Sequence, residues 1–162
     1  MAKKIILETR SEPAFYTLIG ISCHLMDYRL IYELNRKLDF NFIKENDFSI
    51  INSPTGDNLS FSFYIYRDED QRLSYYLLSN RGREGLLFPK FKQADFLLII
   101  EGVFRKQKKD ILLTSLHSVP KVLTAFEVKH SDLRNLESFL MDLELHIMNI
   151  NKELKQKNPT KT

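Results

Sequence analysis

The chain of 162 residues is 43% hydrophobic and 28% charged, and it contains 12 Phe and 7 Tyr. This composition excludes an intrinsically disordered chain, and the length is that of one domain with a substantial core. The net charge of +3 permits binding to nucleic acid without requiring it.

The apolar runs are short and the cysteine content is low. The run at residues 96–100 is far below the roughly 20 residues that a transmembrane helix needs, and residues 1–10 lack the apolar core of a signal peptide. Cys23 is the only cysteine, which excludes an intrachain disulfide and a zinc site built from cysteines. We therefore expect a cytoplasmic protein without a membrane partner.

Apolar periodicity predicts the elements of the first half of the chain. Residues 15–22 are rich in aromatic and β-branched side chains and predict a buried strand, whereas residues 25–38 carry the apolar stripe of an amphipathic helix. Residues 39–56 predict an irregular connection with room for a short strand. Residues 60–66 alternate apolar and polar side chains, and together with residues 73–79 they predict an antiparallel hairpin.

The second half predicts two further strands and two helices. Residues 88–91 are expected to be extended, and residues 96–101 form a strongly apolar strand. A short helix over residues 110–119 is expected to begin at the N-cap Asp110 and to end before a proline. Residues 122–128 predict the last strand.

The last helix carries the clearest periodic signal, and Ser131 is its expected N-cap. Phe139 and Met148 widen its apolar stripe, which suits packing on a sheet as well as on another helix. Residues 156–162 are expected to form a disordered tail. The stripe itself recurs at spacings of three and four, as heptad positions a and d do, through Leu133, Leu136, Leu140, Leu143, Ile147, Ile150 and Leu154.

The order of these elements predicts the fold class. Strand, helix, hairpin, strand, helix, strand and long helix indicate a single α+β domain over residues 1–155. Helices should pack on a mostly antiparallel sheet, with a long amphipathic helix at the C-terminal end. A ferredoxin-like or ACT-like elaboration is the expected topology.

Three stretches, at residues 18–38, 88–96 and 119–128, share a pattern with one protein family. The matching signature residues are Asp27, Tyr28, Arg29, Asn35, Pro89 and Asp95. The pattern resembles the IPExxxVDY family, which consists of bacterial proteins of uncharacterised function, although Lys90 replaces a Glu of that signature. The resemblance implies a cytoplasmic bacterial protein, and it implies no catalytic residue.

Few residues suggest a catalytic, metal or cofactor site. Cys23 and His24 lie where the first strand meets the first helix, and a helix N-terminus lowers a thiol pKa and favours a nucleophile. An ordinary interior cysteine is the alternative, and we favour it because no second His is close in sequence. The histidines are scattered, and Gly-rich nucleotide motifs and G-x-S-x-G are missing from the sequence. We therefore expect no catalytic residue, no metal and no cofactor.

The hairpin and the loop after it suggest a contact with RNA. Tyr64, Tyr66 and Tyr76 are expected to share the polar face of the hairpin, near Arg81 and Arg83, where the rings could stack on bases. A sheet face that carries tyrosines is more often covered by a helix, and the RNP1 pattern is missing.

The leading prediction is a noncatalytic binding or adaptor module that acts through protein–protein contacts. In this reading the heptad stripe of the last helix docks a protein partner or a second copy of the chain. An RNA-associated module is the alternative, and an enzyme built on Cys23 and His24 comes third. Whether the stripe packs on its own sheet or on another chain is left open by the sequence.

Overall fold

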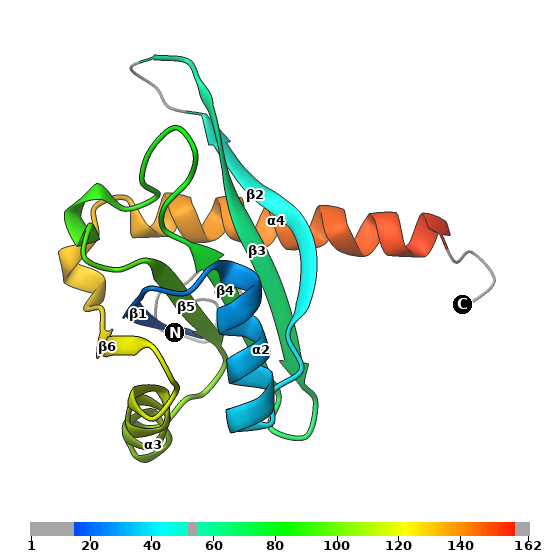
Figure 1. Ribbon diagram of the computed structural model, residues 1–162. Helices are drawn as coiled ribbons and strands as arrows, with labels where there is room; N and C mark the ends of the chain where they lie inside the picture. The colour runs from blue at the N-terminus through cyan, green and yellow to red at the C-terminus, as the bar shows by residue number, and fades with distance from the viewer. Residues whose placement is uncertain (1–14, 52–54, 158–162) are drawn as a thin grey trace, which may run out of the picture.

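A six-stranded antiparallel sheet forms the centre of the molecule (Figure 1). The computed structural model describes residues 15–51 and 55–157. The strand order across the sheet is β2-β3-β4-β5-β1-β6, and all neighbouring strands run antiparallel. The strands are β1 (Tyr16–Cys23), β2 (Ile43–Ile51), β3 (Asn58–Asp68), β4 (Leu73–Ser79), β5 (Phe96–Glu101) and β6 (Val122–Glu127).

Helices cover both faces of this sheet. α2 (Asp27–Leu38) and α3 (Lys106–His117) pack on one face, and α4 (Leu136–Lys157) crosses the other face (Figure 1). Two short 3-10 turns, η2 (Pro89–Phe91) and η3 (His130–Asp132), lie in the connections. The predicted α+β class, with its mostly antiparallel sheet and long C-terminal helix, is confirmed.

Alternation of side chains along the strands builds two separate cores. Phe63 and Leu78 lie in the core under α4, whereas their neighbours Tyr64 and Leu77 lie in the core under α2 and α3. Because helices cover both faces, β1 and β5 are buried along nearly their whole length. The central strands therefore appear in the sequence as continuous apolar runs.

The connectivity is that of an elaborated ferredoxin-like fold, as predicted. Strands β2 to β5 form a continuous meander, and β1 and β6 are added beyond β5. The chain contains the two split β-α-β units of that fold, β1-α2-β2 and β5-α3-β6. In each unit other strands lie between the two strands that the helix joins, so all neighbouring strands remain antiparallel. The extent of β2 was underestimated: it is a nine-residue edge strand within the segment predicted to be mostly irregular. Its exposed polar run and the register shift between Glu45 and Phe48 obscure the alternation that marks a strand.

Two predicted helix starts are wrong. α3 begins at Lys106, ahead of the expected cap Asp110, whose carboxylate instead pairs with the Lys106 ammonium at 2.8 Å. Ser131 lies within η3, and α4 begins only at Leu136. Asp and Ser favour turns as well as caps, so their presence alone does not locate a helix end. α4 extends through Lys157, and residues 158–162 of the predicted tail lie outside the described residues.

A buried asparagine organises the long connection between β4 and β5. Asn80 is 1% exposed, and its Nδ2 donates to the carbonyl oxygens of Phe91 at 3.0 Å and Ala94 at 2.9 Å. Its Oδ1 accepts from the backbone N–H of Phe88 at 2.7 Å. One side chain thus satisfies backbone groups along the whole connection, including those around η2.

Replacing Asn80 by Ala should lower the free energy of unfolding by about 2–4 kcal/mol, because buried backbone groups lose their partners. Urea unfolding monitored by circular dichroism measures the change. The control is Asn149→Ala on the exposed side of α4, which should cost less than about 0.5 kcal/mol. Equal effects of the two substitutions would show that Asn80 does not hold this connection.

Candidate functional site

The hairpin tyrosines do not share one face. Tyr76 pairs with Ile65, so it projects to the side opposite to Tyr64 and Tyr66. Its ring stacks on Phe63 with centroids 6.0 Å apart under α4, and its hydroxyl donates to Glu101 at 2.6 Å. The prediction of a common tyrosine face is wrong because it depended on the hairpin register, which places Tyr66 opposite Tyr75.

The rings and cations of the predicted RNA contact are largely engaged inside the protein. Tyr64 is buried and donates to Asp27 Oδ2 at 2.9 Å, and Tyr66 is half-buried against Tyr75. Arg81 Nε donates to Asp95 Oδ1 at 2.7 Å, whereas Arg83 is exposed. The hairpin therefore lacks the open stacking platform that binding to single-stranded RNA uses.

Three residues of the family-like signature hold loops in place. Asn35, near the end of α2, binds both backbone groups of Phe42, accepting from its N–H at 2.9 Å and donating to its carbonyl at 3.3 Å. Asp95 accepts from the backbone N–H of Cys23 at 2.9 Å and from Arg81. Asp27 ties α2 to β3 through Tyr64. These polar groups bind neighbouring segments of the chain.

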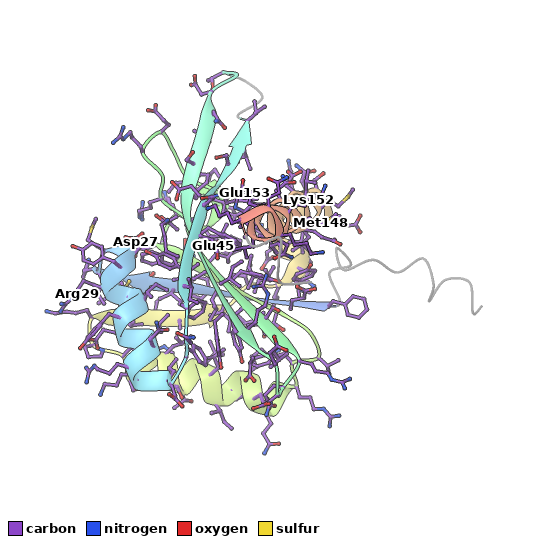
Figure 2. All side chains as sticks on the ribbon, turned by 90° about the vertical axis from the view of Figure 1, so that its right-hand side faces the viewer. Asp27, Arg29, Glu45, Met148, Lys152 and Glu153 are labelled. Carbon is purple, nitrogen blue, oxygen red and sulfur yellow. The ribbon has the colours of Figure 1, made fainter. Side chains whose placement is uncertain are left out.

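The other signature residues are exposed. Tyr28 and Arg29 lie on the outer side of α2, and Figure 2 shows Arg29 projecting away from the sheet. The Arg29 guanidinium lies 6.0 Å from the ring centroid of Tyr32, a cation–π distance. Pro89 starts η2, where its fixed φ suits the first helical position.

Asp27 remains ionised to a lower pH than an ordinary aspartate. Partial burial opposes its ionisation, but hydrogen bonds from Ser62, Tyr64 and the Tyr28 backbone, together with the nearby Lys44, hold the pKa of Asp27 below its usual range. The folded pKa is below the unfolded value. The stabilisation that ionised Asp27 gives the folded protein is therefore present above the unfolded pKa of about 3.9. It is lost as the pH falls through the folded pKa.

We expect Asp27→Asn to destabilise the protein near pH 7 by about 1 kcal/mol, since the hydrogen bonds to the charged group are lost. The difference in unfolding free energy between wild type and variant should shrink as the pH falls below about 4. Denaturant unfolding at several pH values measures it, with Asp57→Asn at an exposed turn as the control. A difference that stays constant down to pH 2.5 would contradict this account of Asp27.

Cys23 and His24 are not brought together as a catalytic pair. Cys23 is buried at the end of β1, whereas His24 is exposed. Burial raises the pKa of the Cys23 thiol, a backbone hydrogen bond at Leu25 lowers it, and the Asp95 carboxylate raises it, with a net increase. A raised thiol pKa is the reverse of what a cysteine nucleophile needs.

The Cys23 thiol should therefore react with Ellman's reagent at pH 8 roughly 100-fold more slowly in the folded protein than in the urea-unfolded chain. Because Cys23 is the only cysteine, the absorbance change reports on this residue alone. Equal rates in the two states would show that the Cys23 thiol is reactive and accessible in the folded protein, which would contradict this account.

Three of the four histidines bind backbone groups. His130 Nε2 donates to the carbonyl of Tyr16 at 2.8 Å, and His146 Nε2 donates to that of Asn46 at 2.9 Å. His117 donates through Nδ1 to the Leu113 carbonyl at 2.8 Å. Within residues 15–51 and 55–157, no three His, Cys, Asp or Glu side chains are grouped so as to hold a metal ion.

The heptad stripe of α4 packs mainly on its own sheet. Ile147 is partly buried, and Leu154 is largely exposed where α4 continues past the sheet (Figure 1). The stripe joins the core with Phe63, Leu78 and Ile99. Its buried members, which are not open to a partner, are Leu133, Leu136, Leu140, Leu143 and Ile150.

A second apolar stripe lies on the opposite side of α4. We call Met141, Leu145 and Met148 the outer stripe; their exposed fractions are 61%, 57% and 49%. Their spacings of four and three place them on one helical face. Figure 2 views α4 along its axis and shows Met148 away from β2, whereas Glu153 lies toward β2 and accepts from Asn46 at 2.9 Å.

Charge is divided along the exposed side of α4. The acidic residues of the first half are Glu137, Asp142 and Glu144, and the second half carries Lys152, Lys155 and Lys157 together with Glu153, which lies toward β2 (Figure 2). The outer stripe lies between these two groups. The surface therefore has an acidic end, an apolar middle and a mainly basic end.

A groove of about 430 Å³ joins the outer stripe to the edge of the sheet. It is lined by Ile50 and Ile51 of β2 and by Leu145 and Asn149 of α4. Ile51 is exposed, and β2 is an edge strand of the sheet. The prediction that Met148 widens the heptad stripe is wrong, because Met148 lies on the opposite side of α4. The spacings of four and three within the outer stripe are visible in the sequence, whereas the continuation of this stripe onto β2 depends on tertiary packing.

Comparison with known proteins does not identify a function for the chain. No protein-family model matches the chain, and no curated protein matches it. Among the described residues, no helix has the length and apolar character needed to cross a membrane.

Proposed function

We propose that the chain is a noncatalytic protein-binding module whose outer stripe on α4 docks a second copy of the same chain. The observation that carries this proposal is the exposure of Met141, Leu145 and Met148 on one face of a helix. The opposite face of α4 already completes the core, so folding does not require a second apolar stripe. Contiguous exposed apolar side chains flanked by charged ones are typical of protein interaction surfaces.

The charge pattern favours a second copy in antiparallel orientation. Two α4 helices that cross near Leu145 and Met148 in opposite directions bring Glu137 and Glu144 of one copy toward Lys152 and Lys155 of the other. A parallel pair would place like charges together. A helix of 22 residues is about 33 Å long, and the groove beside β2 extends the contact toward the area of a stable dimer.

We also propose that the chain belongs to the IPExxxVDY family, whose signature it resembles. Asp27, Asn35 and Asp95 bind other parts of the chain, which supports a role in holding the fold. A cytoplasmic location is part of the proposal as well, and the single buried, free Cys23 supports it.

The protein should sediment as a dimer at micromolar concentration, and Leu145→Glu should weaken dimerisation at least roughly 100-fold, because a charge would enter the centre of the contact. Sedimentation velocity over a concentration series measures the dissociation constant. The matched control is Leu123→Glu on β6, where the wild-type side chain is 59% exposed at the far edge of the sheet.

A wild-type protein that remains monomeric up to 100 μM would contradict docking of a second copy. Equal weakening by Leu123→Glu and Leu145→Glu would place the contact elsewhere. Circular dichroism of both variants establishes that each retains the fold.

A further inference from the structure

The face of the sheet opposite to α4 carries a cavity of about 400 Å³. It lies between the end of α2, the turn that joins β3 to β4, and α3, three elements that are separate in the sequence. Its size falls in the lower part of the range found for small-molecule sites. α2 and α3 both pack on this face of the sheet (Figure 1).

Aromatic rings line the inner part of this cavity. Phe40 lies against Tyr75 with centroids 4.9 Å apart and planes inclined by 38°. Phe104 stands nearly perpendicular to Tyr75, at 6.4 Å and 85°. The three rings form an apolar corner, and flat or bulky apolar groups bind well in such corners.

Two side chains of opposite charge line this cavity, and both contact Gln71. The Asp68 carboxylate accepts from the backbone N–H of Gln71 at 3.2 Å, and the Lys108 ammonium donates to the side-chain oxygen of Gln71. Asp68, Gln71 and Lys108 all line the cavity. Gln71 thus connects a carboxylate and an ammonium group, each with further hydrogen-bonding capacity.

Tyr75 adds a polar group at the base of the same cavity. The residue is 6% exposed, and its hydroxyl makes no hydrogen bond within the described part of the chain. Fully buried side-chain polar atoms among those residues all have partners, so this hydroxyl retains some accessible surface. Because Tyr75 lines the cavity, a ligand bound there can contact this residue.

We propose that this cavity binds a free α-amino acid with a large apolar side chain. The apolar side chain lies against Phe40, Tyr75 and Phe104, the ammonium group pairs with Asp68, and the carboxylate pairs with Lys108. A ligand with a single charge leaves one of the two protein charges without its partner. The inference is independent of docking through α4, because the cavity and the outer stripe lie on opposite faces of the sheet.

The test titrates the ¹⁵N-labelled full chain with L-phenylalanine and with two analogues that lack one charge each, 2-phenylethylamine and 3-phenylpropionate. Amide shifts should map to the β3–β4 turn and to α3, and each analogue should bind roughly tenfold more weakly than L-phenylalanine. Asp68→Asn should weaken L-phenylalanine binding and leave 3-phenylpropionate unaffected. Lys108→Met should weaken L-phenylalanine binding and leave 2-phenylethylamine unaffected.

Matched controls are Asp57→Asn and Lys106→Met, which remove one charge of each sign from exposed positions outside the cavity lining. They should leave binding unchanged, and Leu145→Glu should leave it unchanged as well. Shifts that map elsewhere, no saturable binding up to 10 mM, or equal affinity for all three compounds would overturn the proposal.

Discussion

Burial of the heptad stripe of α4 against the sheet is the interaction on which the rest of the structure depends. Without it, the face that carries Phe63, Leu78 and Ile99 would be open to water. Each large apolar side chain buried there contributes about 1.5–3 kcal/mol to folding. The packing also fixes the rotation of α4 about its axis. Once Leu140 and Leu143 lie inward, the outer stripe must face solvent on the opposite side of α4, where Leu145 borders the groove beside β2.

The two faces of the sheet thereby acquire different properties. On one side, a single long helix leaves an exposed apolar surface with acidic and basic ends, suited to a second copy of the chain. On the other side, α2 and α3 flank a cavity lined by aromatic rings and by two side chains of opposite charge, Asp68 and Lys108. The polar signature residues Asp95 and Asp27 connect parts of the scaffold: Asp95 joins the loop before β5 to β1, and Asp27 joins α2 to β3. Both proposed sites therefore lie on surfaces that a rigid scaffold positions.

Local patterns predicted most elements, because apolar periodicity records which side of an element is buried. β5 was predicted with its observed bounds, and β1, α2 and the hairpin were close. The edge strand β2 was underestimated because few of its side chains are buried and its register shifts. The prediction of a common tyrosine face is wrong because the register of a hairpin depends on its turn. A shift of the register by one residue moves Tyr76 to the other face of the sheet. The cavity was not predictable, since Phe40, Tyr75 and Phe104 meet only through tertiary packing.

The orientation of two α4 helices in the dimer tests the central claim most directly. Spin labels on Ser138→Cys and Gln156→Cys, both at exposed positions of α4, report it by pulsed dipolar spectroscopy, while the buried Cys23 stays unlabelled. The two positions lie about 27 Å apart along one helix. When the two labelled variants are mixed, an antiparallel pair places residue 138 of one copy within about 20 Å of residue 156 of the other. The distance between the two residues 138 in a dimer of the first variant is then longer. A short distance between the two residues 138, or no distance between copies at all, would contradict the account.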